Sequence, residues 1–201
     1  MNYRKIDHRV QKLTPNEAFT YICLLSKTDF ITYESHIKQA NLLIFINEMG
    51  LKMSEKTLRN HLNKFKEVGL IEINDAWIKG NKGVFLRNTY KINTEHYELL
   101  DVSILKLNIP AKTIGFLAIL WTLSFNFSNY TALNNTQIVE RTRVGKNSIS
   151  GFVKEAVNAG LLQKKKGRLI FKNEEIFIKS IESEESMAKR IYPEVFADGF
   201  N

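Results

Sequence analysis

The sequence predicts a mainly α-helical protein with small β-hairpin wings, built as two tandem units of the same element order. Three observations support this prediction. Apolar residues recur at helical spacing in several stretches, and glycines at positions 50, 69 and 160 end three of them. Short apolar strands separated by turn residues follow the last two of these glycines. The order of elements in the first half then recurs in the second half.

The first unit opens with a strong helix start. In "LTPNEAF", Thr14 is placed to cap a helix, Pro15 to fill its first position and Glu17 to complete a capping box. A second helix is expected to run through "LLIFINEM" to Gly50. Ser54 is then a suitable cap for a third helix. In that helix one apolar stripe is formed by Leu58, Leu62 and Phe65. The strands "LIEI" and "VFLRNTYKI" follow, joined by the turn "KGNKG".

The second unit repeats this order. "KTIGFLAILWTLS" predicts an apolar helix, "NTQIVERTRV" a short helix and turn, and "KNSISGFVKEAVNAG" an amphipathic helix. "LLQKKKGRLIFK" then predicts a strand, a basic turn and a strand. Under an offset of 91 residues, Gly69 aligns with Gly160 and Leu62 with Val153. The order of elements is that of two tandem winged helix-turn-helix domains.

Charge divides the chain into blocks. The whole chain carries a net charge of +8. We expect a basic N-terminal arm at 1–12, a first domain at 13–93, an acidic linker at 94–105, a second domain at 106–172, and an acidic, partly helical tail at 173–201. The two blocks 1–93 and 106–172 carry net charges of +6 and +9. Basic charge gathered in this way favours a polyanionic partner.

The two halves resemble known domains. "LTPNEAFTYICLL" together with "NEMGLKMSEKTLRNHLNKFKEVGLIEI" resembles the winged helix of bacterial regulators and of phage and plasmid replication proteins. "KTIGFLAILWTLSF" with "NNTQIVERTRVGKNSISGFVKEAVNAGLL" is similar to the winged helix of phage replisome-organiser and DnaD-like proteins, although Ala156 stands where that pattern usually has leucine. The resemblance implies double-stranded DNA binding by the third helix of each unit. It also implies a role in replication initiation or transcription regulation for a phage or other bacterial mobile element.

Helices that enter the major groove read base edges with Arg, Lys, Asn and Gln near their N-termini. In the first unit the candidate DNA contacts are Ser54, Lys56, Thr57, Arg59, Asn60 and Asn63. In the second unit they are Lys146, Asn147, Ser148, Ser150 and Lys154. A solvated helix face with good caps would have the same composition, and this alternative stays open.

Phosphate contacts are expected beside these helices. Arg141 and Arg143 flank the turn before the last predicted helix and are candidates to hold phosphates. The hairpin tip "QKKKGR" gathers Lys164, Lys165, Lys166 and Arg168. Four cations in five residues repel one another, and a phosphate backbone would offset that repulsion. The alternative is a turn that is basic only for solubility.

Other functional classes have little support in the sequence. The four histidines show no metal-ligand spacing, and no glycine-rich phosphate loop is present. We therefore expect no enzyme activity, no catalytic residues, no metal and no cofactor. Cys23, the single cysteine, is expected to be a buried thiol, and Trp77 and Trp121 to be core residues. No apolar run is long enough to cross a bilayer, so we expect a cytoplasmic, nucleoid-associated protein without a membrane partner.

Two functions of different classes therefore compete. The first is sequence-specific binding of double-stranded DNA through two recognition helices and basic wings. The second is a protein–protein interaction module that uses winged helices as docking domains. A homodimer, or a complex with a replication or transcription protein, is compatible with either. The sequence does not give the DNA target or the oligomeric state.

Overall fold

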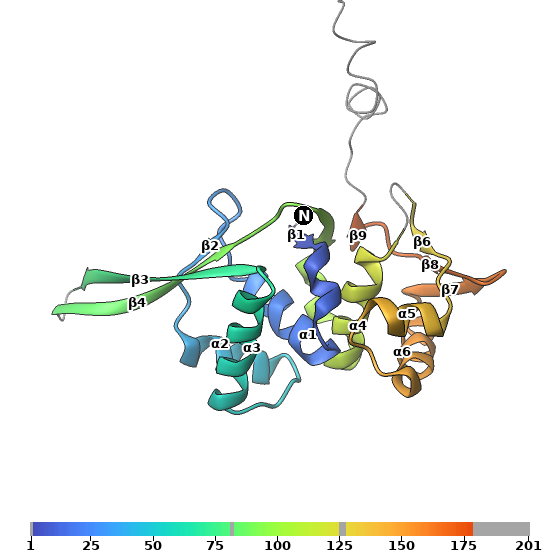
Figure 1. Cartoon of the computed structure of the whole chain (residues 1–201), viewed down its shortest axis with the longest axis horizontal. Helices are drawn as coiled ribbons and strands as arrows, with labels where there is room; N and C mark the ends of the chain where they lie inside the picture. The colour runs from blue at the N-terminus through green and yellow to red at the C-terminus, as the bar shows by residue number, and fades with distance from the viewer. Residues whose placement is uncertain (1, 81–82, 125–127, 179–201) are drawn as a thin grey trace, which may run out of the picture.

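The structure is a computed structural model that describes residues 2–80, 83–124 and 128–178. For residues 75–80 and 83–87 it describes the backbone pairing only. The side chains of Trp77, Lys79 and Lys82, and the part of the predicted tail after residue 178, lie outside the described residues. Figure 1 shows the elements along the long axis of the molecule.

The first half contains three helices and a long hairpin. Its elements are α1 (Pro15–Leu25), β2 (Glu34–Ser35), α2 (Gln39–Glu48), α3 (Glu55–Glu67), β3 (Ile71–Gly80) and β4 (Gly83–Ile92). The strands form an antiparallel sheet in the order β2-β4-β3. The predicted capping box at Thr14 and Glu17 is present, and Ser54 caps α3 by accepting a hydrogen bond from the Thr57 backbone. Both predicted helix starts are therefore confirmed.

The second half has the same order of elements. It contains α4 (Ala111–Thr122), β6 (Tyr130–Thr131), α5 (Asn135–Arg141), α6 (Lys146–Asn158), β7 (Leu162–Lys165) and β8 (Arg168–Phe171). Its antiparallel sheet has the order β6-β8-β7, which corresponds strand for strand to β2-β4-β3. The predicted recurrence of element order is therefore confirmed. In Figure 1 the hairpins β3-β4 and β7-β8 extend toward opposite ends of the molecule.

A third sheet joins the two halves. It has the order β1-β5-β9, formed by β1 (Tyr3–Asp7), β5 (Tyr97–Asp101) and β9 (Phe177–Ile178). Two short 3-10 helices, η1 (His8–Lys12) and η2 (Val102–Lys106), follow β1 and β5. The segments expected to be an arm, a linker and the start of the tail thus pair with one another at the centre of the molecule.

The prediction of a mainly α-helical protein is wrong. The described residues contain three antiparallel sheets of three strands each beside the helices, so the protein is a mixture of α and β structure. The strands β1, β5 and β9 account for much of the difference. Partners in β1 and β5 lie 90 to 98 positions apart and those in β5 and β9 lie 77 to 79 apart, and local periodicity carries no signal of such pairing.

One hydrophobic core runs through both halves. Helices α1 and α4 pack side by side at its centre, and the fully buried side chains of Phe19 and Phe116 belong to it. Trp121 is buried, as predicted, and its Nε1 donates a hydrogen bond of 3.0 Å to the carbonyl of Leu99 in β5. The core therefore fixes the two halves against each other and against the central sheet.

Gly115 allows the closest approach between α1 and α4. A Cβ atom built at this position would lie 1.9 Å from the carbonyl oxygen of Pro15 and 2.9 Å from the backbone nitrogen of Phe19. These distances are far inside van der Waals contact, and the neighbouring atoms belong to backbone. Any side chain at Gly115 would therefore force the two helices apart.

Candidate nucleic-acid interface

The sequence of α3 buries one face and exposes the other. Leu58, Leu62 and Phe65 lie in the core, with at most 1% of each side chain exposed. The opposite face carries polar and basic residues. All six predicted contacts of this helix and its cap are exposed: Ser54, Lys56, Thr57, Arg59, Asn60 and Asn63. The structure therefore places them together on one accessible face.

Three of these six residues have intramolecular partners. Ser54 and Thr57 are engaged in the helix cap, with 3.0 Å between their hydroxyl oxygens. The Arg59 guanidinium donates to Glu55, 2.9 Å away, one helical turn earlier. Both of these charged side chains are exposed, and such an ion pair contributes little stability. Arg59 can therefore exchange Glu55 for another acceptor at little cost.

Helix α6 presents a corresponding face. Ile149 and Ala156 are buried, while the predicted contacts Lys146, Asn147, Ser148, Ser150 and Lys154 are all exposed. The N-terminus of α6 has no side-chain cap. The Ser148 N–H donates to the Gly145 carbonyl at 3.0 Å, and the positive end of the helix dipole favours an anion nearby. Ser150 Oγ lies 3.4 Å from the side-chain nitrogen of Asn135, which ties α6 to α5.

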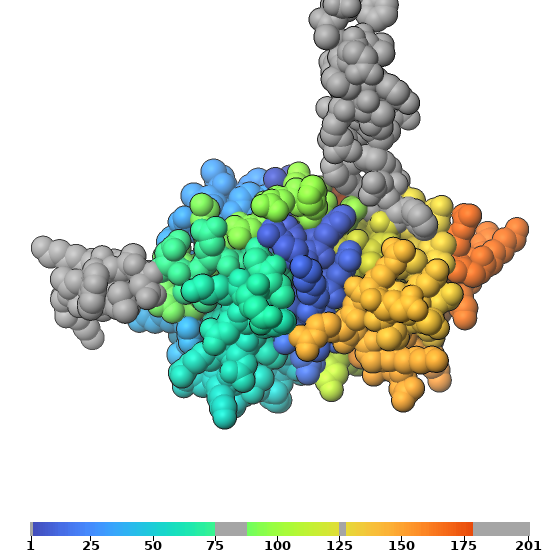
Figure 2. Space-filling model, in the orientation of Figure 1, coloured from blue at the N-terminus to red at the C-terminus, as the bar shows by residue number. Residues whose placement is uncertain are grey.

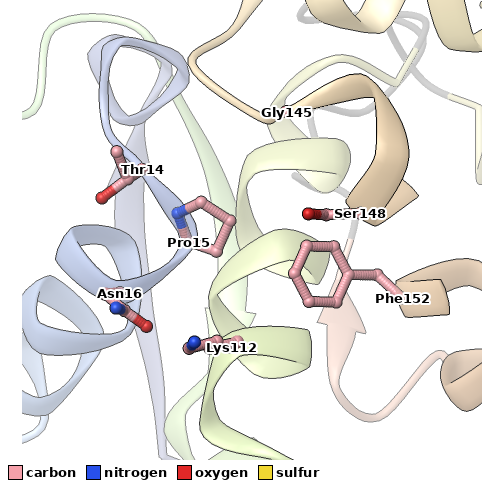
Figure 3. A pocket seen from close by; sticks show the side chains of 7 residues that line it. All are labelled: Thr14, Pro15, Asn16, Lys112, Gly145, Ser148 and Phe152. Carbon is pink, nitrogen blue, oxygen red and sulfur yellow. The ribbon is translucent and has the colours of Figure 1, made fainter. Parts of the chain in front are cut away.

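Ser148 also borders a hollow in the protein surface. It lines a hollow of about 170 Å³ between the starts of α1, α4 and α6, together with Pro15, Lys112 and Phe152. Figure 3 shows Ser148 and Phe152 pointing from α6 toward α4 and the start of α1. Phe152 stacks on Phe116 with 5.2 Å between ring centroids. This end of α6 thus packs on α4, and the start of α1 lies across the hollow from it.

The turn before α6 is held by one side chain. Thr142 Oγ1 donates to the carbonyl of Ile138 at 2.6 Å and accepts from the backbone N–H of Val144 at 3.2 Å. Arg141 and Arg143 flank this residue, and both are exposed. The Arg143 guanidinium lies 4.0 Å from the carboxylate of Glu17. The turn therefore presents two guanidinium groups from a fixed backbone.

The hairpin β7-β8 closes with a two-residue turn. Lys166 and Gly167 have φ values of 47° and 74°, as a type I′ turn requires. Lys164, Lys165, Lys166 and Arg168 are all exposed on this hairpin. Lys165 lies directly opposite Arg168 on the paired strand. Like charges in this position destabilise the hairpin. Within the described residues none of the three lysines forms an ion pair, whereas Arg168 lies over the ring of Tyr130, 4.5 Å from its centroid.

The N-terminal segment is mostly a structural element. Arg9 forms two hydrogen bonds of 2.8 Å with the carboxylate of Asp7, which is 1% exposed. Burial would raise the pKa of Asp7, but the hydrogen bonds and charge of Arg9 outweigh it, and the pKa is lowered. Lys5 lies over the rings of Tyr33 and Tyr97. The sequence did not predict the role of Lys5 because Tyr33 and Tyr97 are far from it along the chain, and it did not predict that of Arg9 because the burial of Asp7 depends on the fold.

His61 links α3 to α1 by a hydrogen bond. Its Nδ1 lies 2.9 Å from Thr20 Oγ1, whose own proton goes to the Asn16 carbonyl. His61 therefore donates from Nδ1. Burial lowers the pKa of His61 from 6.5, against the opposing charge of Glu17. Because the folded pKa is the lower one, this contribution to stability is present above pH 6.5 and is lost as the pH falls toward the folded pKa.

We expect His61→Gln to reduce the pH dependence of stability. Glutamine is polar and of similar length, but it does not titrate. Between pH 7.5 and pH 5.5, the melting temperature of the variant should fall less than that of the wild type. Thermal unfolding at both pH values measures this, with the exposed His96 as the control position for a His→Gln change. An equal fall in wild type and His61→Gln would show that His61 does not carry the effect.

Catalysis and metal binding find no support in the described part of the chain. It contains no group of three or more His, Cys, Asp or Glu side chains that could hold a metal ion. Cys23 is buried, as predicted, and burial raises the pKa of its thiol, so the reactive thiolate is disfavoured. None of the described helices has the length and apolar character needed to cross a membrane.

Two comparisons with known proteins found no match. A scan against models of protein families finds no match, and a search of curated proteins finds none either. The assignment of a function therefore rests on the residues and the geometry described above.

Proposed function

We propose that this protein binds double-stranded DNA sequence-specifically, with α3 and α6 as recognition helices and the hairpins as wings. Each half offers the same arrangement, an exposed polar face on the helix that precedes a hairpin. Arg59 can pair with guanine, and Asn60 or Asn63 with adenine. The second half offers more cations for phosphates, from Lys146 to the hairpin tip.

The observation that carries the proposal is the hairpin β7-β8. Its three lysines are exposed, stand beside Arg168 and have no carboxylate partner among the described residues. This unfavourable concentration of charge is offset when phosphates bind there and release their counterions. The turn geometry also holds these charges at the tip of a short, well-defined hairpin.

The biological output would be replication initiation or transcription regulation, in the nucleoid of a bacterial cell and on a phage or other mobile element. The position of the bound sites separates the two outputs. Repeated sites at an origin would indicate an initiator, and a site at a promoter would indicate a regulator. Partner proteins of either process would bind in addition to DNA.

Titration of a labelled pool of random duplexes, of about three helical turns, tests the proposal. Fluorescence anisotropy at several salt concentrations between 50 and 200 mM would give the affinity and its salt dependence. We expect binding at 50 mM salt and a steep loss of affinity as salt rises. If the full chain binds no duplex even at 50 mM salt, the proposal fails and docking to a protein becomes the better account.

A further inference from the structure

A basic groove lies between the two halves of the molecule. It has a volume of about 470 Å³ and is walled by the end of α3, by η1 and by the turn between α5 and α6. Its charged residues are Lys12, Lys64, Arg141 and Arg143, with Glu67 and Glu140. In Figure 2 these three segments, coloured teal, blue and orange, meet on the face that carries α3.

The charges of this groove do not cancel. Lys64 is paired with Glu67, with 2.6 Å between Nζ and Oε1, so these two charges offset each other. Arg143 lies 4.0 Å from Glu17, which is a loose contact. Within the described residues Lys12 and Arg141 have no ion-pair partner, and Glu140 is the remaining carboxylate. The groove therefore keeps an excess of positive charge.

The walls of the groove are fixed by contacts from both halves. Gln11, which precedes Lys12, donates from its side chain to the carbonyl of Thr122 at the end of α4. Arg9 packs closely on Gly69, which follows α3. A Cβ atom built at Gly69 would lie 3.1 Å from Nη1 of Arg9. Thr142 holds the turn that carries the two arginines. The cations therefore project from preorganised backbone rather than from a loose arm.

We propose that this groove binds the phosphodiester backbone of DNA between the segments read by α3 and α6. The inference rests on the proposed function. A duplex that contacts both recognition helices on one face must pass its backbone across the region between them, where this groove lies. Lys12, Arg141 and Arg143 would contact phosphates there, and Glu140 would oppose them. These residues position the duplex without reading its sequence.

Two substitutions of opposite sign in the same groove test the inference. Arg141→Gln removes a cation, and the neighbouring Glu140→Gln removes a carboxylate; both residues are exposed. In the duplex titration, we expect Arg141→Gln to weaken binding about ten-fold near 0.1 M salt and to reduce the salt slope by about one. Glu140→Gln should strengthen binding several-fold. The double variant Lys12→Gln with Arg141→Gln should reduce the salt slope by about two.

The outcomes separate this inference from the proposed function. If the wild type binds duplex and all three variants bind it with wild-type affinity and salt slope, the groove assignment is wrong while DNA binding stands. If the wild type does not bind, the proposed function itself has failed. A free phosphate is the other source of the same chemistry. Inorganic phosphate at matched ionic strength tests this source. If it raises the melting temperature of the wild type but not of the double variant, while both bind duplex with equal affinity, the groove holds a free phosphate. That result overturns the inference.

Discussion

Gly115→Ala is expected to destabilise the protein by at least about 2 kcal/mol. The added methyl group would lie 1.9 Å from the carbonyl oxygen of Pro15. Overpacking a filled core costs about 1–3 kcal/mol, and here the obstructing atoms are backbone atoms that cannot rotate away. Alanine improves helix propensity by only about 1 kcal/mol, so the steric cost outweighs it.

Gly151→Ala is the matched control. Gly151 is also inside a helix, but a Cβ atom there would have no neighbour within 4 Å. Only the gain in helix propensity remains, and we expect stabilisation of up to about 1 kcal/mol. Urea unfolding followed by circular dichroism measures both variants. If Gly115→Ala leaves the free energy of unfolding unchanged or raises it as Gly151→Ala does, the tight packing of α1 against α4 is not as described.

The second large effect concerns the hairpin tip. The triple variant Lys164→Gln, Lys165→Gln and Lys166→Asn should bind duplex DNA roughly a hundred-fold more weakly near 0.1 M salt, with a salt slope shallower by about three. Each lysine that contacts a phosphate releases about one counterion, which sets these magnitudes. The duplex titration measures the affinity and the slope together.

The fold should survive this change. Asn-Gly is the preferred pair for a type I′ turn, and asparagine tolerates the positive φ of Lys166 better than lysine does. The melting temperature should therefore be unchanged or slightly higher. Lys106→Gln, on η2, removes one exposed charge away from the hairpin and serves as the control for net charge. Unchanged affinity and slope in the triple variant would remove the hairpin from the interface.

The sequence predicted the elements that depend on residues close together along the chain. The caps at Thr14 and Ser54 depend on hydrogen bonds to the backbone N–H three residues later in the chain. The stripe of Leu58, Leu62 and Phe65 follows from helical periodicity, and its burial is confirmed. For the candidate interface, exposure of the chosen side chains was predicted in the same way, since residues opposite an apolar stripe face solvent.

Long-range contacts explain what the sequence did not predict. The acidic composition of 94–105 indicated a linker, yet Tyr97–Asp101 is the central strand β5, flanked by β1 and β9. Asp7 belonged to the expected basic arm, but its buried carboxylate accepts a hydrogen bond from the backbone N–H of Glu95, 88 positions later. The groove at Lys12 likewise arises only when η1, α3 and the α5–α6 turn meet in space. None of these contacts has a signature in the spacing of neighbouring residues.

Selection from a pool of random duplexes tests the central claim most directly. Because α1 and α4 pack together and the central sheet joins the two halves, α3 and α6 are held at a fixed separation. Duplexes retained at about 150 mM salt and then sequenced should contain two different motifs at one constant spacing, near one helical turn of about 10 bp. Insertion of about five base pairs between the motifs should abolish specific binding. Retained duplexes with no motif, or with motifs at random spacing, would contradict the account.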